Sequence, residues 1–544
     1  MIRQPRNGNS PLPRVCWLPL ALFAVLLAAS WCQAATWQYR VSFDRGPDKR
    51  GQRREPGDVL LWLPAESETI RGLLLVGRLG IEGELIVDPQ VRDACRENDL
   101  GIVYFTPHLS GVFHYWEPGN RDGETLLRAL DDLAECSGRD EVRRVPWITA
   151  GHSTAGIFAR NVAYWKPDRV AGILHIKSGN FHQREHLPPK GSLAGVPLVA
   201  INGQLETYGP EGGIRPEFGR ETQWVFVRQD IRKFREREPD HLISLLVHPG
   251  ADHFHGAPEI ACCAALFLAK TAEHCLPAEL PGGSGPVACL PLAAEDGWLS
   301  DPDLYEPKSP AAPYDEYTGD KNAAFWHYDR EIARATVEFH RNLGRHQVLT
   351  NPECAWLDEG DGWTFRARSE FLDTMPEKYG GRVGGKRVGH AKGAIIYRAK
   401  PNEPVARVGP DRFRLLRPAR RVFIAAFHPG DEQYRSTIRW GSIEMPRLKD
   451  AKQQTIEFPS VPDLTAGSGP VKLRAKTSSG LPVFYEVDYG PVVVEDGVLT
   501  ISEVPRGARF PMPCRITAHQ IGRRTSSPVA PAEPVSITFD VVGP

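Results

Sequence analysis

The sequence predicts an α/β protein with a mainly parallel, doubly wound sheet, followed by C-terminal β-sandwich domains. Between about residues 37 and 280, short apolar runs alternate with amphipathic segments of helix length. From about residue 355 onward, short β-branched and aromatic runs are instead separated by Gly, Pro and Asp. Strands that alternate with helices favour parallel pairing, whereas closely spaced strands favour antiparallel sheets. We therefore expect two architectures in one chain.

The first 34 residues are typical of a secretory signal peptide. Three arginines and no acidic residue precede position 35, and the run VCWLPLALFAVLLAA is followed by SWCQAA. A basic start, a short apolar core and small residues at the cleavage site define such a peptide. We expect cleavage after Ala34 and a secreted or periplasmic protein; a lipoprotein anchor at Cys32 is the alternative, which the bulky Trp31 disfavours. No other segment is long and apolar enough to span a bilayer.

Residues 37–280 form the predicted α/β domain. It opens with two antiparallel strands, in WQYRVSFD and DVLLWLP. Near-continuous apolar runs, typical of parallel strands covered on both faces, lie at Gly72–Gly77, Gly101–Pro107, Val170–Lys177, Val196–Gly203 and Ile243–Gly250. Amphipathic helices are expected at Pro89–Asn98, Glu124–Glu135, Thr154–Trp165, Thr222–Arg237 and Pro258–Glu273.

The segment VPWITAGHSTAG, residues 145–156, is interpreted as a buried strand that enters a sharp turn and then a helix. Ser153 lies at the tip of that turn. Such a corner exposes a serine hydroxyl above a sheet, although the same residue type also suits a helix N-cap. Glycine is expected two residues after such a serine, and this chain has Ala155 there, with Gly156 one place later.

The region around this segment resembles the α/β-hydrolases over its whole length. In that family the nucleophilic serine is followed in the chain by an acid and then a histidine, each in a loop after a strand. Here VPLVAING is followed by Glu206, and ISLLVHPG is followed by His253. A serine needs an imidazole to take its proton and a carboxylate to orient that imidazole. The resemblance therefore implies the catalytic residues Ser153, His253 and Glu206.

Other residues compete for two of these roles. Asp252 is an alternative acid because it adjoins His253, but adjacent residues on an extended loop usually point apart. His248 and His255 are alternatives to His253 as the base. His248 falls within or at the end of a strand, whereas His253 follows the Pro-Gly turn.

The resemblance also implies an oxyanion hole and a substrate pocket. One donor would be the backbone N–H of Thr154, and the second would come from GRLGIEGE, with Arg78 and Leu79 as candidates. We expect His152 and Trp116 to contact substrate, because the loop of Trp116 follows a strand at the same edge of the sheet.

The composition excludes several functions. Removal of the three N-terminal arginines takes the formal net charge from −1 to about −4, which gives no reason to expect nucleic acid as a partner. No Cys or His spacing suits zinc, and no metal or cofactor is expected. Eight cysteines remain after cleavage, and some can pair in an exported protein. A bridge from Cys262 or Cys263 to Cys275 or Cys289 is the favoured local pairing, but the sequence leaves the connectivity open. The sequence leaves the oligomeric state open.

Three further regions follow the α/β domain. Residues 281–354 are predicted to form a linker and a helical extension, in which Phe325, Tyr328, Ile332, Ala335 and Phe339 recur near helical spacing. Residues 355–450 are predicted to be β-rich. Residues 455–542 resemble bacterial immunoglobulin-like domains through SSGLPV and the spacing of their strands.

We therefore expect an exported serine hydrolase that cleaves carboxylic esters through an acyl-enzyme, with acylated polysaccharide as one candidate substrate. A peptidase or amidase on the same scaffold is the alternative enzyme. A non-catalytic surface-binding protein with a degenerate hydrolase domain is the alternative from another class.

Overall fold

The fold was analysed in a computed structural model, which describes residues 37–46, 52–77, 79–107, 109, 112–178, 187–206, 223–256, 258–341, 345–377, 385–400 and 403–544. The expected signal peptide and Arg78 lie outside these residues. The chain from residue 34 onward forms one compact unit. No helix among the described residues has the length and apolar character needed to cross a membrane.

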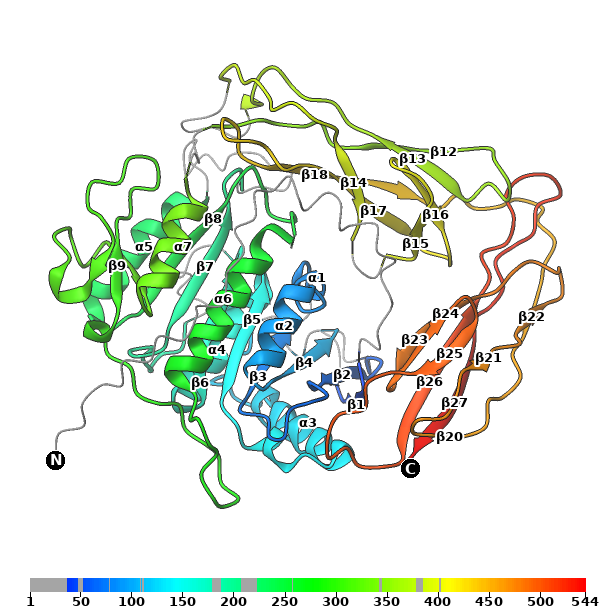
Figure 1. Ribbon diagram of the computed structural model, residues 1–544, viewed down its shortest axis with the longest axis horizontal. Coiled ribbons are helices and arrows are strands. Elements are labelled where there is room, and N and C mark those ends of the chain that lie inside the picture. The colour runs from blue at the N-terminus through cyan, green and yellow to red at the C-terminus, as the bar shows by residue number, and fades with distance from the viewer. Residues whose placement is uncertain are drawn as a thin grey trace. The chain divides into compact units, whose positions relative to one another are not determined.

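A mixed eight-stranded sheet forms the centre of the N-terminal half and resembles the sheet of the α/β-hydrolase fold (Figure 1). The strand order is β1-β2-β4-β3-β5-β6-β7-β8. The β1–β2 and β2–β4 pairs are antiparallel, and every other neighbouring pair is parallel. The strands are β1 (Tyr39–Phe43), β2 (Gly57–Trp62), β3 (Gly72–Gly77), β4 (Leu100–Thr106), β5 (Trp147–His152), β6 (Val170–Ile176), β7 (Leu198–Gly203) and β8 (Ile243–His248).

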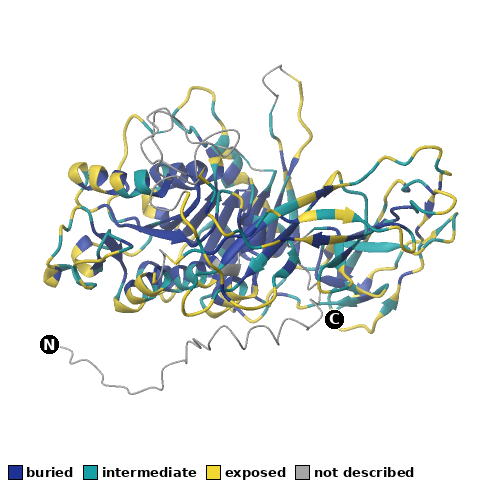
Figure 2. Cartoon of the chain, turned by 90° about the horizontal axis from the view of Figure 1, so that it is seen from above, coloured by how far each residue is buried: buried dark blue, intermediate teal, exposed yellow. Residues whose placement is uncertain are grey.

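Helices cover both faces of this sheet. One apolar core lies between the sheet and α3, α4 and α5, and a second lies between the opposite face and α1, α2 and α6. In Figure 2 the strands of this sheet are buried while the outer sides of the helices are exposed. The helices are α1 (Glu82–Leu85), α2 (Pro89–Glu97), α3 (Asp122–Ser137), α4 (Thr154–Trp165), α5 (Gln223–Arg237) and α6 (Pro258–Cys275).

Local signals set the ends of these helices. Asp88 caps α2 by accepting a hydrogen bond from the N–H of Gln90, and Pro89 occupies the first helical position, where its missing N–H costs nothing. Gly138 ends α3 with a left-handed φ of 74°. The expected strands and helices of this half therefore match the observed ones to within a few residues.

The segment between the sheet and the β regions contains more strand than expected. A small antiparallel sheet, β10-β9-β11, precedes helix α7. Phe325 belongs to β11 and Tyr328 precedes the helix, so the expected helical register begins too early. Asp329 caps the helix by accepting from the N–H groups of Glu331 and Ile332. The elements are β9 (Trp298–Ser300), β10 (Ala312–Pro313), β11 (Phe325–His327) and α7 (Arg330–Phe339).

Two mainly antiparallel β regions follow, and their sheets are consistent with β-sandwich domains; β20 and β27 pair parallel. The middle β region contains the sheets β12-β13-β16-β15 and β14-β17-β18, which enclose their own apolar core. Its strands are β12 (Glu353–Trp356), β13 (Thr364–Arg368), β14 (Ile396–Ala399), β15 (Val405–Arg407), β16 (Arg412–Leu415), β17 (Arg421–His428) and β18 (Thr437–Glu444).

The C-terminal β region contains the sheets β20-β27-β26-β23, β21-β25-β24 and β19-β22. It contacts the start of the α/β sheet, where the N–H of Gly490 donates to the carbonyl of Trp37 and Arg139 donates to the carbonyl of Arg506. The strands are β19 (Ile456–Glu457), β20 (Leu464–Thr465), β21 (Val471–Lys472), β22 (Lys476–Thr477), β23 (Phe484–Tyr489), β24 (Val492–Glu495), β25 (Val498–Ile501), β26 (Met512–His519) and β27 (Val535–Val542).

The expected disulfide is absent among the described residues. Cys262 and Cys263 lie near the start of α6, and Cys275 is its last residue. At about 1.5 Å of rise per residue, a dozen residues separate the two ends by roughly 18 Å, far beyond the span of a disulfide. Cys289 lies at the Cys275 end, because the N–H of the next residue, Leu290, donates to the carbonyl of Cys275. The predicted pairing is therefore wrong.

Candidate active site

Ser153 occupies a sharp turn between β5 and α4. Its backbone has φ 54° and ψ −127°, a conformation that residues with a side chain rarely adopt. Ser153 holds the N-cap position of α4, but its side chain makes no capping hydrogen bond. The hydroxyl is instead turned toward His253, so capping does not explain this serine.

The three residues expected to form the triad are brought together. Nε2 of His253 lies 3.0 Å from Oγ of Ser153, and Nδ1 of His253 lies 2.6 Å from Oε1 of Glu206. A carboxylate can only accept, so Nδ1 carries the proton and Nε2 of the neutral ring is free to accept from the serine hydroxyl. Glu206 is itself fixed, because its Oε2 accepts from the N–H of Gly203 at 2.9 Å and from Asn202 at 3.3 Å.

The alternative acid and bases have other partners. Oδ1 of Asp252 lies 3.3 Å from Nε2 of His255, and Nδ1 of His255 accepts from the N–H of Asp252. Both His255 and His248 are buried, and burial lowers the pKa of each imidazole well below its usual value. His253, whose side chain is about a third exposed, is the histidine of this loop that meets the serine.

Two glycines, Gly151 and Gly156, lie where the turn leaves no room for a side chain. Ala155 does not lie at such a position. A Cβ on Gly151 would lie 1.9 Å from the carbonyl oxygen of Ala155, and a Cβ on Gly156 would lie 2.4 Å from Cβ of Ser178. Real Cβ atoms do not approach so closely, so both positions require glycine. The methyl group of Ala155 is accommodated in full burial. The departure from the family pattern at Ala155 therefore leaves the turn intact.

Glu82 ties the loop after β3 to the turn that carries Ser153. Its side chain is fully buried in the first turn of α1. Oε2 accepts from the N–H groups of Leu79 and Gly80, at 3.2 and 2.6 Å, and Oε1 accepts from the N–H of His152 at 2.7 Å. Burial raises the pKa of Glu82, while these N–H donors act in the opposite direction.

The predicted oxyanion donors have different outcomes. The N–H of Leu79 already donates to Glu82, which corrects its assignment as a donor to substrate. Arg78 lies outside the described residues. Thr154 is exposed and is the first residue of α4, so its N–H has no partner within the helix. The role of Thr154 as an oxyanion donor stays a prediction.

His152 is buried beside His253, and its contact with substrate stays a prediction. Its side chain is fully buried, and its Nε2 lies 2.8 Å from the carbonyl oxygen of His253, to which it donates. Burial, reinforced by His253, lowers the pKa of His152 well below its usual value, so the ring stays neutral. His152 is therefore a support for the backbone of His253.

Trp116 belongs to the loop after β4 and is partly exposed. Its ring lies 4.8 Å from that of His114 and 5.1 Å from that of Tyr115, measured between centroids. These contacts account for its packing, and its contact with substrate stays a prediction.

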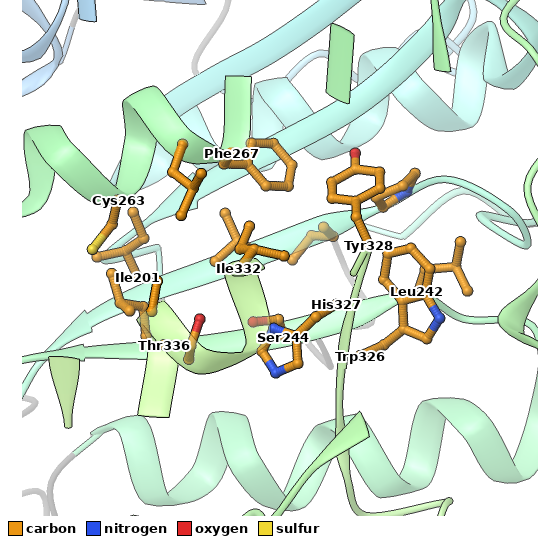
Figure 3. A pocket seen from close by; sticks show the side chains of 16 residues that line it. Ile201, Leu242, Ser244, Cys263, Phe267, Trp326, His327, Tyr328, Ile332 and Thr336 are labelled. Carbon is orange, nitrogen blue, oxygen red and sulfur yellow. The ribbon is translucent and has the colours of Figure 1, made fainter. Parts of the chain in front are cut away.

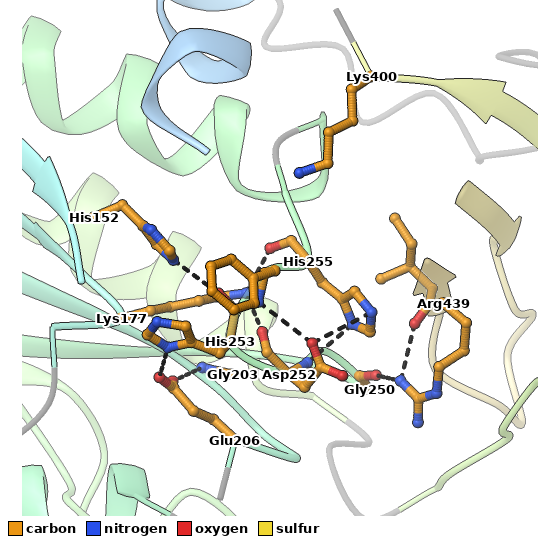
Figure 4. Close-up of polar contacts among 12 residues, drawn as sticks. His152, Lys177, Gly203, Glu206, Gly250, Asp252, His253, His255, Lys400 and Arg439 are labelled. Carbon is orange, nitrogen blue, oxygen red and sulfur yellow. Dashed lines mark hydrogen bonds and ion pairs between the residues drawn. The ribbon is translucent and has the colours of Figure 1, made fainter. Parts of the chain in front are cut away.

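A lysine that the sequence analysis did not single out holds the loop of His253. Lys177 follows β6 and is fully buried, and its Nζ donates to the carbonyl oxygens of Asp252 and His255, at 2.5 Å each (Figure 4). The sequence could have indicated this role, because Lys177 directly follows the apolar run VAGILHI. A lysine that is buried at the end of such a strand needs hydrogen-bond partners. Glu82 gave no comparable signal, because an acidic residue in a loop is ordinary.

The internal cavity in Figure 3 is separate from this site. It lies among β7, β8, α6, β11 and α7 and is lined mainly by apolar side chains, including Phe267, Trp326 and Tyr328. Its polar residue His327 donates to or accepts from Ser300 and is buried, which lowers its pKa to about 3. Its lining includes none of Ser153, Glu206 and His253.

One group of possible metal ligands occurs among the described residues: Glu273, His274 and Asp329. Lys270 already lies among them, with its Nζ 2.7 Å from Asp329 and 3.1 Å from Glu273. The lysine charge balances these carboxylates, so the group is explained as an ion-pair cluster between α6 and the start of α7.

Comparisons with known proteins give likenesses to serine hydrolases in part of the chain. Poly(aspartic acid) hydrolase-1 from Sphingomonas sp. KT-1 is 17% identical, with 40% of this chain and 94% of that chain covered and a TM-score of 0.29. A poly(3-hydroxybutyrate) depolymerase from Bordetella parapertussis is 17% identical, with 43% and 88% covered and a TM-score of 0.29. A serine hydrolase without a lid from Xanthomonas campestris is 16% identical, with 45% and 97% covered and a TM-score of 0.29. No protein-family profile and no curated protein sequence matches the chain.

Proposed function

We propose that this protein is a serine hydrolase that cleaves carboxylic esters through an acyl-enzyme. The observation that carries the proposal is the unbroken line of hydrogen bonds from Glu206 through His253 to Ser153. That line ends on a serine held in a strained turn above the carboxyl ends of parallel strands. Ligands of open α/β sheets bind at this edge.

In the proposed mechanism, Nε2 of His253 takes the proton from Oγ of Ser153 as Oγ attacks the ester carbonyl carbon. Glu206 accepts from Nδ1 and stabilises the imidazolium that forms. The N–H of Thr154 would donate to the oxyanion. The protonated His253 then gives its proton to the leaving alcohol, and an acyl group remains on Oγ. Water, activated by the same histidine, releases the acid and restores the serine.

Replacement of the nucleophile tests this proposal. Ser153→Ala should lower kcat on a short p-nitrophenyl ester by roughly 10⁴-fold or more and abolish labelling by a fluorophosphonate probe. The control is Ser192→Ala, which changes an exposed serine and should retain both activities. Unchanged turnover in Ser153→Ala would overturn the assignment. Matched p-nitrophenyl esters and p-nitroanilides of one acyl group would separate an esterase from an amidase.

We also propose that the protein is exported and acts on acyl groups carried by a polymer such as polysaccharide. The signal-peptide pattern of residues 1–34 and the two β regions, of which the C-terminal one resembles immunoglobulin-like domains in sequence, support this proposal. Fractionation of an expressing cell, followed by assay on acetylated and feruloylated polysaccharide, tests both parts. Retention of the full-length chain in the cytoplasm would contradict the first part, and release of acid only from small esters would contradict the second.

A further inference from the structure

The loop that carries His253 packs against the middle β region. Ala251 lies in a buried apolar cluster with Ala425 of β17 and Ile438 of β18, bordered by Phe427 and Trp440. Gly250 approaches this hairpin so closely that a Cβ there would lie 2.9 Å from the carbonyl oxygen of Ser436. The loop therefore packs closely against residues that lie about 180 positions later in the chain.

Arg439 makes the polar contact across this junction. Its side chain is among the largest fully buried ones, with 2% exposure. Nη1 donates to the carbonyl oxygen of Gly250 at 2.8 Å and to that of Ile438 at 2.9 Å, as Figure 4 shows. A guanidinium is always charged and has five donors, so a buried arginine of this kind holds the acceptors it reaches in a fixed arrangement.

The loop is thus held on both sides of His253. Arg439 binds it at residue 250, and Lys177 binds it at Asp252 and His255. The N–H of Gly250 is also engaged, because it donates to Oε1 of Gln204 at 2.9 Å. Gly250 itself has φ 63°, so the direction of the chain into the loop depends on this residue.

The loop of Glu206 rests on the same β region. Leu205, the residue before the proposed acid, is buried in a cluster with Val348 and Met375. Both loops that meet Ser153 therefore have their outer sides against residues beyond 345. A spacer would need no such contacts, since a spacer domain acts only through its length.

We propose that Arg439 is a positioning residue for His253, and that the middle β region is a structural half of the active site. This inference rests on the proposed serine hydrolase function. The guanidinium fixes the carbonyl of Gly250, and with it the path of the loop that places Nε2 of His253 3.0 Å from Oγ of Ser153. A displacement of about 1 Å at a reacting group can lower a rate roughly 100-fold.

The test compares full-length variants on a short p-nitrophenyl ester. Arg439→Met keeps most of the side-chain volume and removes the donors, and should lower kcat roughly 100-fold with KM changed less than about threefold. The rate of labelling by a fluorophosphonate should fall in parallel, because it reports on Ser153 and His253 alone. Arg439→Lys should restore part of kcat, and millimolar methylguanidinium should do the same in Arg439→Ala. The matched control is Arg368→Met, since the side chain of Arg368 is 77% exposed in the same β region.

Several results would overturn the inference. A folded Arg439→Met variant with kcat and labelling close to those of the parent chain is one. A loss of activity that neither Lys nor methylguanidinium recovers is another, because it indicates general disruption. Where Arg439→Met does not fold, Arg439→Ala replaces it, and full activity of that variant without methylguanidinium has the same meaning. Failure of the proposed function is distinguishable, because Ser153→Ala would then retain turnover.

Discussion

Glu82 accepts a hydrogen bond from the backbone N–H of His152, with 2.7 Å between Oε1 and the nitrogen. His152 directly precedes the proposed nucleophile, and the other oxygen of Glu82 holds the N–H groups of Leu79 and Gly80. One buried carboxylate therefore fixes both the turn of Ser153 and the loop that faces it.

Replacement of Glu82 by glutamine should lower kcat by about 10- to 100-fold. An amide has a single acceptor oxygen, so its NH₂ group would face one of the backbone N–H donors that a carboxylate satisfies. Steady-state kinetics on a short ester, with KM recorded alongside kcat, measure the effect. Glu124→Gln is the control, because Glu124 is an exposed residue of α3. A Glu82→Gln variant with the kcat of the parent would refute the positioning role.

Gly156→Ala should be far more harmful than Ala155→Gly. The added methyl group at residue 156 meets Cβ and Oγ of Ser178, at 2.4 and 2.5 Å, so α4 must move away from Ser178, two residues beyond the end of β6. Overpacking of this kind costs about 1–3 kcal/mol and shifts Ser153 as well. Ala155→Gly removes a methyl group and lowers helix propensity, at about 1 kcal/mol. The melting temperature and kcat of the two variants test this prediction. Equal losses in Gly156→Ala and Ala155→Gly would contradict the close approach at Gly156.

Phe254 should select esters with an apolar or aromatic acyl group. Its side chain is 57% exposed, and its ring lies 4.6 Å from that of His253 and 5.6 Å from that of His152 between centroids. An exposed aromatic ring beside the proposed base, His253, offers apolar contact area to substrate. Phe254→Ala should raise KM for a phenylacetyl ester about fivefold to tenfold and leave KM for the acetyl ester nearly unchanged. Val408→Ala, at another exposed apolar residue, is the control, and an equal rise for both esters would refute the prediction.

The free energy of unfolding should fall steeply as the pH drops from 7 to 5. Burial is the largest cause that lowers the pKa of nine histidines among the described residues: His175, His241, His327 and His340 to about 3, His346 to about 4, His152, His248 and His255 well below the usual value, and His428 below it. The unfolded chain binds these protons near pH 6.5, so acid favours unfolding. Each of the first four contributes up to about 2 kcal/mol over this range.

Urea unfolding at pH 5, 6 and 7 measures this dependence. Acids whose pKa is raised by burial, among them Asp230, Glu403 and Glu82, act in the opposite direction. Burial raises the pKa of Asp230 to about 6, so its contribution to stability is complete in acid and is lost as the pH rises through 6. Asp230→Asn should therefore make the loss of stability in acid steeper. A urea midpoint that stays constant or rises between pH 7 and pH 5 would show that the buried histidines do not control acid stability.

The sequence predicts the α/β half well because its signals are local. Apolar runs of strand length and the small residues around Ser153 depend on near neighbours in the chain, and the order of Glu206 and His253 follows the order of the strands. The helix near residue 330 was placed too early because the spacing of Phe325 and Tyr328 also suits a strand and a cap. The supports of the site were missed, since the partners of Glu82, Lys177 and Arg439 are backbone atoms brought near by the fold.

The contact between Arg439 and Gly250 has a consequence for when activity arises as the chain is made. A nascent chain that has reached residue 430 already contains Ser153, Glu206 and His253, but it lacks β18 and the guanidinium that holds the histidine loop. With the proposed role of Arg439, such a chain turns over ester at least about 100-fold more slowly than the full chain. Full catalytic activity would then arise late in synthesis, after the middle β region has emerged and folded against the loop. A fragment that ends near residue 280 would contain every reacting group but would lack the support that these groups require.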